Sequence, residues 1–290
     1  MKKSRKLATL GICSALFLGL AACQQQHATS EGTNQRQSSS AKVPWKASYT
    51  NLNNQVSTEE VKSLLSAHLD PNSVDAFFNL VNDYNTIVGS TGLSGDFTSF
   101  THTEYDVEKI SHLWNQKKGD FVWTNCRINS YCLLKNSVTI PKLEKNDQLL
   151  FLDNDAIDKG KVFDSQDKEE FDILFSRVPT EATTDVKVHA EKMETFFSQF
   201  QFNEKARMLS VVLHDNLDGE YLFVGHVGVL VPADDGFLFV EKLTFEEPYQ
   251  AIKFASKEDC YKYLGTKYAD YTGEGLAKPF IMDNDKWVKL

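Results

Sequence analysis

The chain has 290 residues, and its 40 Asp and Glu outnumber its 31 Lys and Arg, which gives a formal net charge of −9 at pH 7. Its 20 Phe, 10 Tyr and 4 Trp supply enough aromatic surface for a sizeable core. Because the charge is acidic and no basic stripe runs through the sequence, we expect neither nucleic-acid binding nor an electrostatic membrane patch.

The N-terminal 22 residues have the pattern of an export signal. A basic start, made of Lys2, Lys3, Arg5 and Lys6, precedes an apolar run over residues 7–20 that is too short for a membrane span. The run ends in Leu20-Ala21-Ala22-Cys23, which resembles the lipobox of bacterial lipoproteins. This resemblance implies that residues 1–22 are cleaved off and that the thiol of Cys23 carries diacylglycerol. The alternative is an ordinary secretory signal cut after Ala22.

Residues 23–48 are predicted to be the lipidated cysteine followed by a flexible polar stalk. Gln, Ser, Thr and Asn dominate from Gln24 to Lys42, and a segment of this composition cannot bury a core. The expected location is therefore the extracytoplasmic face of the cell membrane, with the lipid on Cys23 as the link to the bilayer. Loss of the leader's four basic residues would take the net charge from −9 to about −13.

Residues 49–290 are predicted to form one α+β domain, with helices first and an antiparallel sheet last. Caps and apolar spacing indicate helices from the capping box at Ser57–Glu60 to Pro71, from Asn72 or Ser73 through Tyr84, from Thr103 or Asp106 to Gly119, and over residues 167–177 and 183–200. Asp153-Asn154-Asp155 with Asp158 lacks the spacing of a calcium loop, and we interpret it as an acidic solvated turn.

Cys126 is the first candidate for chemistry. Asn125 is a good N-cap, so Cys126 would be the first residue of a helix. Unpaired backbone N–H groups and the positive end of the helix dipole favour a thiolate there, and Arg127 acts in the same direction. The sequence therefore predicts a nucleophile, with a small buried hydrophobe as the alternative.

Two other cysteines, Cys132 and Cys260, accompany Cys126 in the domain. Cys126 and Cys132 are too far apart to bridge if both lie on one helix, because the rise between them would be about 9 Å. The alternatives are a Cys132–Cys260 disulfide, a Cys126–Cys260 disulfide, or none.

The last part of the domain is typical of antiparallel strands, over residues 208–214, 221–231 and 237–243. His226 would share a face of its strand with Val224, Gly228 and Leu230. A hairpin loop over residues 233–236 would place Glu241 opposite Gly228, and so diagonally next to His226. A carboxylate that orients an imidazole is half of a nucleophile–base relay. His214 is the rival base, although its place at a strand end is more typical of a turn residue.

Asn125-Cys126 at a helix start, followed by Gly225-His226-Val227-Gly228-Val229 on a strand, resembles the papain-like NlpC-type cell-wall peptidases. The resemblance implies a papain-like fold, Cys126 as nucleophile, His226 as base and Glu241 as the third residue. The backbone N–H of Cys126 would then be an oxyanion donor, and no metal or organic cofactor is implied.

That family usually has Asp-Cys-Ser-Gly at the nucleophile, where this chain has Asn125-Cys126-Arg127-Ile128. The whole chain also resembles an uncharacterised family of bacterial lipoproteins whose domain has no assigned function. The expected activity is hydrolysis or transfer of amide or ester bonds, with cell-wall peptides as the favoured substrate. The alternative is a non-catalytic surface lipoprotein that binds a ligand or partner on a degenerate papain-like fold.

Overall fold

The computed structural model describes residues 46–100, 103–121 and 123–290. The predicted signal peptide, Cys23 and nearly all of the predicted stalk lie outside these residues. Within them the fold is α+β, with eight α-helices and a nine-stranded antiparallel sheet. The helices are α1 (Gln55–Ser66), α2 (Pro71–Val88), α3 (Val107–Lys118), α4 (Cys126–Leu134), α5 (Phe151–Gly160), α6 (Ser165–Leu174), α7 (Val186–Phe197) and α8 (Lys257–Lys267).

The large sheet has the strand order β11-β10-β6-β7-β8-β9-β1-β2, and β4 pairs with β7 off this path. A separate two-stranded sheet joins β3 to β5. The strands are β1 (Ala47–Thr50), β2 (Thr98–Ser99), β3 (Val138–Thr139), β4 (Val178–Pro179), β5 (Gln201–Phe202), β6 (Arg207–Asp215), β7 (Tyr221–Ala233), β8 (Gly236–Lys242), β9 (Tyr249–Phe254), β10 (Phe280–Asp283) and β11 (Lys286–Val288).

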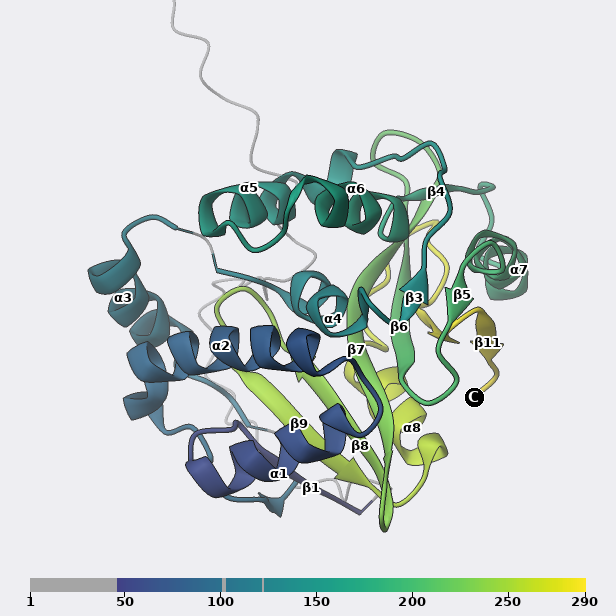
Figure 1. Ribbon diagram of the computed structural model, residues 1–290. Coiled ribbons are helices and arrows are strands. Elements are labelled where there is room, and N and C mark those ends of the chain that lie inside the picture. The colour runs from purple at the N-terminus through teal and green to yellow at the C-terminus, as the bar shows by residue number, and fades with distance from the viewer. Residues whose placement is uncertain (1–45, 101–102, 122) are drawn as a thin grey trace, which may run out of the picture. The chain divides into compact units, whose positions relative to one another are not determined.

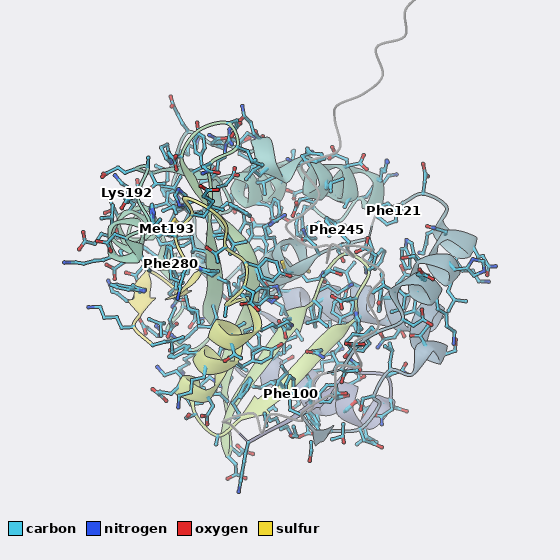
Figure 2. The ribbon with its side chains drawn as sticks, turned by 180° about the vertical axis from the view of Figure 1, so that it is seen from behind. Phe100, Phe121, Lys192, Met193, Phe245 and Phe280 are labelled. Carbon is cyan, nitrogen blue, oxygen red and sulfur yellow. The ribbon has the colours of Figure 1, made fainter. Side chains whose placement is uncertain are left out.

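Helices cover both faces of the sheet. Figure 1 shows α2 and α4 on one face, and the larger core cluster lies between these helices and the strands. Seen from behind in Figure 2, α8 lies across the other face, over a second cluster that contains Phe239, Ile252 and Leu264. The order of helices first and sheet last therefore holds only in part, because β1 pairs with β9 and α8 returns to cover the sheet.

Local capping explains where the first helices begin, and it corrects two predicted boundaries. The side chain of Asn54 accepts from the N–H of Ser57, so Asn54 and not Ser57 is the cap of α1. Asp70 caps α2 in the same way, and Pro71 is its first residue instead of the end of the preceding helix. Proline suits the first position of a helix because an N–H group there would have no intrahelical acceptor. The cap at Asp106 and the end of α3 at Gly119 are as predicted.

The predicted acidic turn is wrong. Residues 151–160 form α5, and Asp153 within it is only 1 % exposed. The run of Asp residues suggested exposure to solvent, but the carboxylate of Asp153 is buried because it pairs with Arg127 of α4. No helix in the described part of the chain is long and apolar enough to cross a membrane.

A β-bulge in β7 reverses which residues face which layer. Val211 of β6 pairs with His226, but the next residue, Val212, pairs with Val224, so Gly225 is the extra residue. Val224 therefore packs in the larger core cluster, whereas Leu230 packs in the cluster beneath α8. The expectation that His226 shares a face with Val224 is wrong for this reason, while its shared face with Leu230 is retained.

Candidate active site

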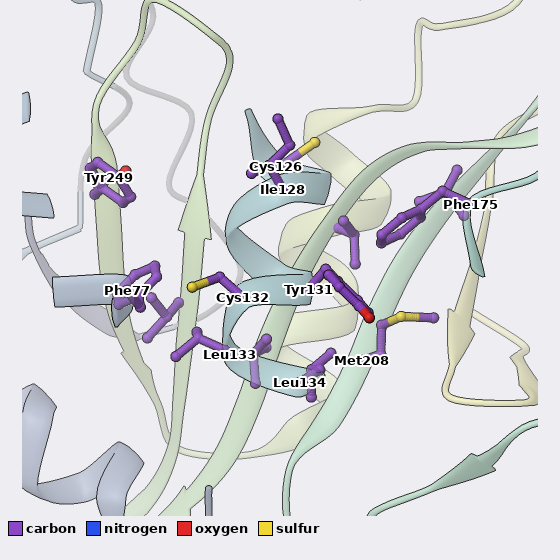
Figure 3. Close-up of a cluster of buried hydrophobic side chains, with 14 of the residues drawn as sticks. Phe77, Cys126, Ile128, Tyr131, Cys132, Leu133, Leu134, Phe175, Met208 and Tyr249 are labelled. Carbon is purple, nitrogen blue, oxygen red and sulfur yellow. The ribbon is translucent and has the colours of Figure 1, made fainter. Parts of the chain in front are cut away.

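Cys126 is the first residue of α4, as predicted. The side-chain oxygen of Asn125 accepts from the N–H of Ile128 at 3.1 Å, which fixes the start of the helix. Figure 3 shows the sulfur of Cys126 at the first turn, turned away from Tyr249, whereas the sulfur of Cys132 points toward Phe77. The side chain that sequence analysis chose as nucleophile thus lies at the N-terminus of a helix packed on β7.

Glycine at position 225 allows the bulge that directs His226. A Cβ atom added to Gly225 would lie 2.3 Å from Cδ1 of Leu213 on the neighbouring strand, closer than real Cβ atoms approach. The backbone of β7 therefore runs against Leu213 with no space for a side chain. This close approach places the extra residue directly before His226.

His226 and Glu241 are hydrogen-bonded, with Nε2 of the imidazole 2.6 Å from Oε2 of the carboxylate. The predicted hairpin register is confirmed, because Pro232 pairs with Phe237, although the ladder continues to Ala233 and Gly236. At its other end the ladder stops at Val229 and Val240. Beyond this pair β7 and β8 diverge, and α4 lies over the region between them (Figure 1).

Glu241 is held as a carboxylate. Its Oε1 accepts from the Tyr263 hydroxyl at 2.5 Å and lies 3.7 Å from Nζ of Lys267. Burial disfavours the charged form, but the charge of Lys267 and the bonds from His226 and Tyr263 outweigh it and lower the pKa of Glu241 to about 2. Both Tyr263 and Lys267 come from α8, a helix that sequence analysis did not predict.

The imidazole of His226 also interacts with Cys126. Burial favours the neutral ring, but the negative charge of a Cys126 thiolate, a hydrogen bond to Cys126 and the bond to Glu241 together raise the pKa of His226. Because Nε2 bonds Glu241, Nδ1 is the ring nitrogen left for the sulfur. The three predicted residues are therefore brought together in the order Cys126, His226, Glu241.

An aromatic ring fixes the plane of the imidazole. Tyr268 stacks on His226 with ring centroids 4.9 Å apart and an angle of 24° between the planes. Tyr268 lies at the end of α8, the same helix that supplies Tyr263. Tyr263, Lys267 and Tyr268 thus position His226 and Glu241 from the face of the sheet that α8 covers. This helix was not predicted from the sequence.

Asp153 is a supporting residue that sequence analysis missed. Its Oδ1 accepts from the side-chain amide of Asn125 at 2.7 Å, and its carboxylate forms a two-bond ion pair with Arg127 at 2.9 and 2.7 Å. Arg127 also donates to the carbonyl of Val224, next to the bulge, at 3.0 Å. These bonds pair the charge of Arg127 with Asp153 and tie α4 to α5 and β7, while the effect of Arg127 on the Cys126 thiol stays a prediction. Two opposite charges four residues apart on one helix can be paired from the sequence alone. Arg127 and Asp153 lie on different helices, 26 residues apart, so no such spacing indicated their pairing.

His214, the rival base, lies elsewhere. It is a buried residue of β6 and not a turn residue, and its Nε2 is 2.7 Å from Oε2 of Glu220. Its Nδ1 accepts from the N–H of Ala277 at 3.1 Å, and its ring lies against His189. With both nitrogens engaged, His214 is a structural histidine.

The cysteines of the described domain are all free and buried, so neither candidate disulfide is present. Burial raises the pKa of Cys132 to about 12, and burial raises the pKa of Cys260 as well. These two thiols are inert by environment, in contrast to Cys126, which has an imidazole partner.

The site is closed to solvent. The exposed fractions of Cys126, His226 and Glu241 are 1 %, 2 % and 1 %. A hollow of ≈ 500 Å³ opens nearby, lined by Trp123 and Phe121 from the segment before α4 and by Lys118 and Asp83 among others. Trp123 is three residues before Cys126, so their Cα atoms are at most about 11 Å apart.

The family described as a domain of unknown function (DUF4300) matches residues 48–288. The chain belongs to this family. Comparison with curated proteins yields no match, and comparison with solved structures yields none either.

In this DUF4300 domain His226 therefore bonds Glu241, and Cys126 lies where its thiolate raises the pKa of His226. Tyr263 and Lys267 contact Glu241, and Asp153 holds the start of α4. In its described residues no group of three or more His, Cys, Asp or Glu side chains could hold a metal ion. The chemistry that the arrangement allows is nucleophilic attack by sulfur with an imidazole as the proton carrier.

Proposed function

We propose that this protein is a surface lipoprotein whose Cys126, His226 and Glu241 hydrolyse or transfer amide or ester bonds on a papain-like, NlpC-type fold. The observation that carries this proposal is the relay itself, in which Cys126 interacts with His226 and His226 bonds Glu241 at 2.6 Å. The cysteine at a helix start, packed on an antiparallel sheet whose adjacent strands hold the other two residues, supports a papain-like arrangement.

In the proposed reaction, His226 takes the proton of the Cys126 thiol, and the thiolate attacks the carbonyl carbon of the substrate. The C–N or C–O bond then breaks, the leaving group takes the proton from His226, and a thioester with Cys126 remains. Water, deprotonated by His226, releases the acid and restores the thiol; an amine or alcohol in its place gives transfer. Glu241 holds the ring throughout.

The negative charge on the carbonyl oxygen would be stabilised at the N-terminus of α4. The first N–H groups of a helix have no intrahelical partner, and the backbone N–H of Cys126 is one of them. The sulfur and this donor belong to the same residue, so a carbonyl that meets one also approaches the other.

The substrate follows from the proposed location. A protein held at the outer face of the cell membrane by lipid on Cys23 meets cell-wall peptides first, and these contain the amide bonds that a thiolate attacks. Because the three residues are at most 2 % exposed, a substrate reaches the sulfur only after covering side chains move. The hollow lined by Trp123, three residues before Cys126, is a candidate space for the rest of such a substrate.

The test is site-specific acylation of the full-length protein with p-nitrophenyl acetate, followed by mass spectrometry of peptides. We expect acetyl on Cys126, loss of at least tenfold in its rate of formation in His226→Ala, and an unchanged rate in Cys132→Ser. Cys132 is the matched control because it is a buried thiol on the same helix with no imidazole partner. Acetylation of Cys126 at equal rates with and without His226 would contradict the relay.

The anchor is tested separately by Cys23→Ser. We expect the unchanged protein in the membrane fraction, labelled by a radioactive fatty acid, and the variant without label. Label on the variant, or release of an unlabelled wild-type protein, would contradict lipidation at Cys23 while leaving the relay untouched.

One observation favours a second candidate function, a non-catalytic lipoprotein that binds a ligand or partner. The burial of Cys126 at 1 % exposure is what an inert thiol would show. In that case acetylation of Cys126 would be as slow as that of Cys132, and the His226–Glu241 pair would serve only to satisfy two buried polar groups.

A further inference from the structure

A column of three rings leads from the candidate base to the surface of the molecule. Tyr268 lies on the imidazole of His226, with ring centroids 4.9 Å apart. The ring of Tyr271 is 5.4 Å from that of Tyr268 on a centroid basis. The exposed fraction rises along this column, from 2 % for His226 through 8 % for Tyr268 to 39 % for Tyr271. Tyr268 therefore separates the buried imidazole from an aromatic ring that solvent reaches.

The backbone beneath the column changes from helix to exposed segment at Tyr268. The N–H of Tyr268 donates to the carbonyl of Leu264 at 3.1 Å, which ends α8. Each of residues 269–275 is then exposed, and the chain returns to the core at Ala277, whose N–H donates to Nδ1 of His214 at 3.1 Å. The ring that covers His226 is thus attached where a packed helix gives way to the exposed segment 269–275.

The bonds of this segment join neighbours in the chain. The N–H of Tyr271 donates to the carbonyl of Tyr268 at 3.1 Å, and that of Thr272 to the carbonyl of Asp270 at 2.9 Å. Gly275 has φ of +77°, a conformation that glycine adopts without strain. Exposed backbone and few buried contacts are typical of regions that open at a small cost in free energy. Local bonds of this kind persist when the segment moves as a unit.

The proposed reaction requires an opening beside the imidazole. Nε2 of His226 bonds Glu241 at 2.6 Å, so the proton passes between substrate and ring at Nδ1. Glu241 is 1 % exposed and accepts from Tyr263, which leaves no approach from that end of the relay. On the face of the ring, by contrast, Tyr268 is the covering group and the surface lies directly beyond it.

We infer that Tyr268 is the gate of the candidate site: its ring moves off His226 together with the segment 269–275, and the substrate enters from the face of the sheet that α8 covers. This inference rests on the proposed function, because it assigns an entrance to the same nucleophile. Tyr271 is then the first ring that an incoming peptide meets, and a planar peptide group lies well against an aromatic face.

The test compares two maleimides of different size on Cys126 of the full-length protein, with mass spectrometry to locate the label. In Tyr268→Ala we expect fluorescein-5-maleimide to react at least tenfold faster than in the wild type, because the covering ring is gone. The small N-ethylmaleimide should gain less, since it needs a smaller opening. Tyr268→Phe keeps a ring over the imidazole and should restore slow labelling by the large reagent. Equal gains for both reagents would overturn the gate.

Two other thiols distinguish a gate from a loosened fold. Cys260 lies on α8, the helix that ends before Tyr268, and Cys132 lies on α4 with Cys126. Both are buried and free, and Tyr268→Ala should leave both unlabelled. Labelling of Cys260 together with Cys126 would mean that Tyr268 only holds α8 against the sheet, and it would overturn the inference.

The rival entrance is the hollow lined by Phe121 and Trp123, which also includes residues of α2. Phe121→Ala widens this hollow and leaves the column of rings intact. We expect it to leave the labelling of Cys126 by fluorescein-5-maleimide unchanged. If Phe121→Ala accelerates this labelling and Tyr268→Ala does not, the substrate enters through the hollow and the inference is wrong.

A further measurement uses the wild-type chain. After fluorescein-5-maleimide has reacted with Cys126, amide hydrogen exchange over residues 268–276 should accelerate, because the ring cannot return to His226. Unchanged exchange there would contradict the gate. If wild-type Cys126 is acetylated no faster than Cys132, the proposed function fails; if its acetylation depends on His226 but its labelling is indifferent to Tyr268, only this inference fails.

Discussion

Gly225 of β7 lies so close to Leu213 of β6 that a Cβ atom at position 225 would be 2.3 Å from Cδ1 and 2.6 Å from Cγ of the leucine. The residue directly after Gly225 is His226, whose orientation depends on the bulge at this point. The contact between a glycine and a leucine on neighbouring strands therefore decides where the candidate base points.

Replacing Gly225 by Ala should destabilise the protein by about 1–3 kcal/mol, because β7 or Leu213 must shift to make space. Cys126 alkylation should slow as His226 moves. Urea unfolding and alkylation rates check both effects. Gly273→Ala is the matched control, since the added Cβ would meet Leu276 at an ordinary 3.4 Å. Equal effects of the two substitutions would argue against a special role for the bulge.

Glu241→Gln should cost stability as well as reactivity. The pKa of Glu241 is lowered from 4.5 to about 2, so its carboxylate contributes on the order of 3 kcal/mol above pH 4.5, and this contribution disappears as the pH falls through 4.5 to 2. Urea unfolding at pH 7 and at pH 3 should show a smaller difference between wild type and variant at the lower pH.

The control for Glu241→Gln is Glu220→Gln, which alters the pair between buried His214 and half-buried Glu220. It should lower stability with no change in the alkylation of Cys126. If Glu220→Gln slows alkylation as much as Glu241→Gln does, the effect of Glu241 is one of general stability and not of orienting His226.

Asp153→Asn should destabilise the protein by about 3 kcal/mol, because it leaves the guanidinium of Arg127, only 13 % exposed, without its anion. The start of α4 should loosen, since Asn125 would then donate to a neutral amide oxygen instead of a carboxylate. Asp155→Asn, two residues along α5, breaks an exposed pair with Lys159 and should cost about 0.5 kcal/mol or less. Thermal unfolding of both variants distinguishes a buried support from a surface ion pair.

The features that the sequence predicted are local ones. Asn125 and Cys126 are adjacent, so a capping preference alone indicated the start of α4. The register of the β7–β8 hairpin followed from the turn near Asp235 and from the alternation of side chains, which was enough to predict the neighbourhood of His226 and Glu241.

The features that escaped prediction depend on partners far away in the chain. The carboxylate of Asp153 was taken for a solvated group because Arg127, 26 residues earlier, is its partner. Tyr263 and Lys267 could not be assigned to the site without knowing that α8 returns beneath the sheet. The bulge at Gly225 escaped because its cause is the side chain of Leu213 on another strand. Alternation along one strand cannot reveal such a contact.

The last prediction concerns acid sensitivity away from the site. His189 is 0 % exposed, and its ring nitrogens lie 2.7 Å from the Thr180 hydroxyl and 2.7 Å from the carbonyl of Thr183. Burial, aided by the nearby His214, lowers the pKa of His189 below 6.5. As the pH falls, the unfolded chain therefore binds a proton on this histidine before the folded protein does. The contribution of His189 to the free energy of unfolding should decrease below pH 6.5 and be constant above it.

Urea unfolding between pH 5 and pH 8 measures this decrease. His189→Phe, which cannot be protonated, should be less stable at pH 8 because it loses two hydrogen bonds, but its stability should depend less on pH. The control is His112→Gln, which removes an imidazole at an exposed position of α3 and should leave the acid sensitivity in place. A pH slope that survives in His189→Phe would assign the acid sensitivity to other groups and leave His189 as a purely packing residue.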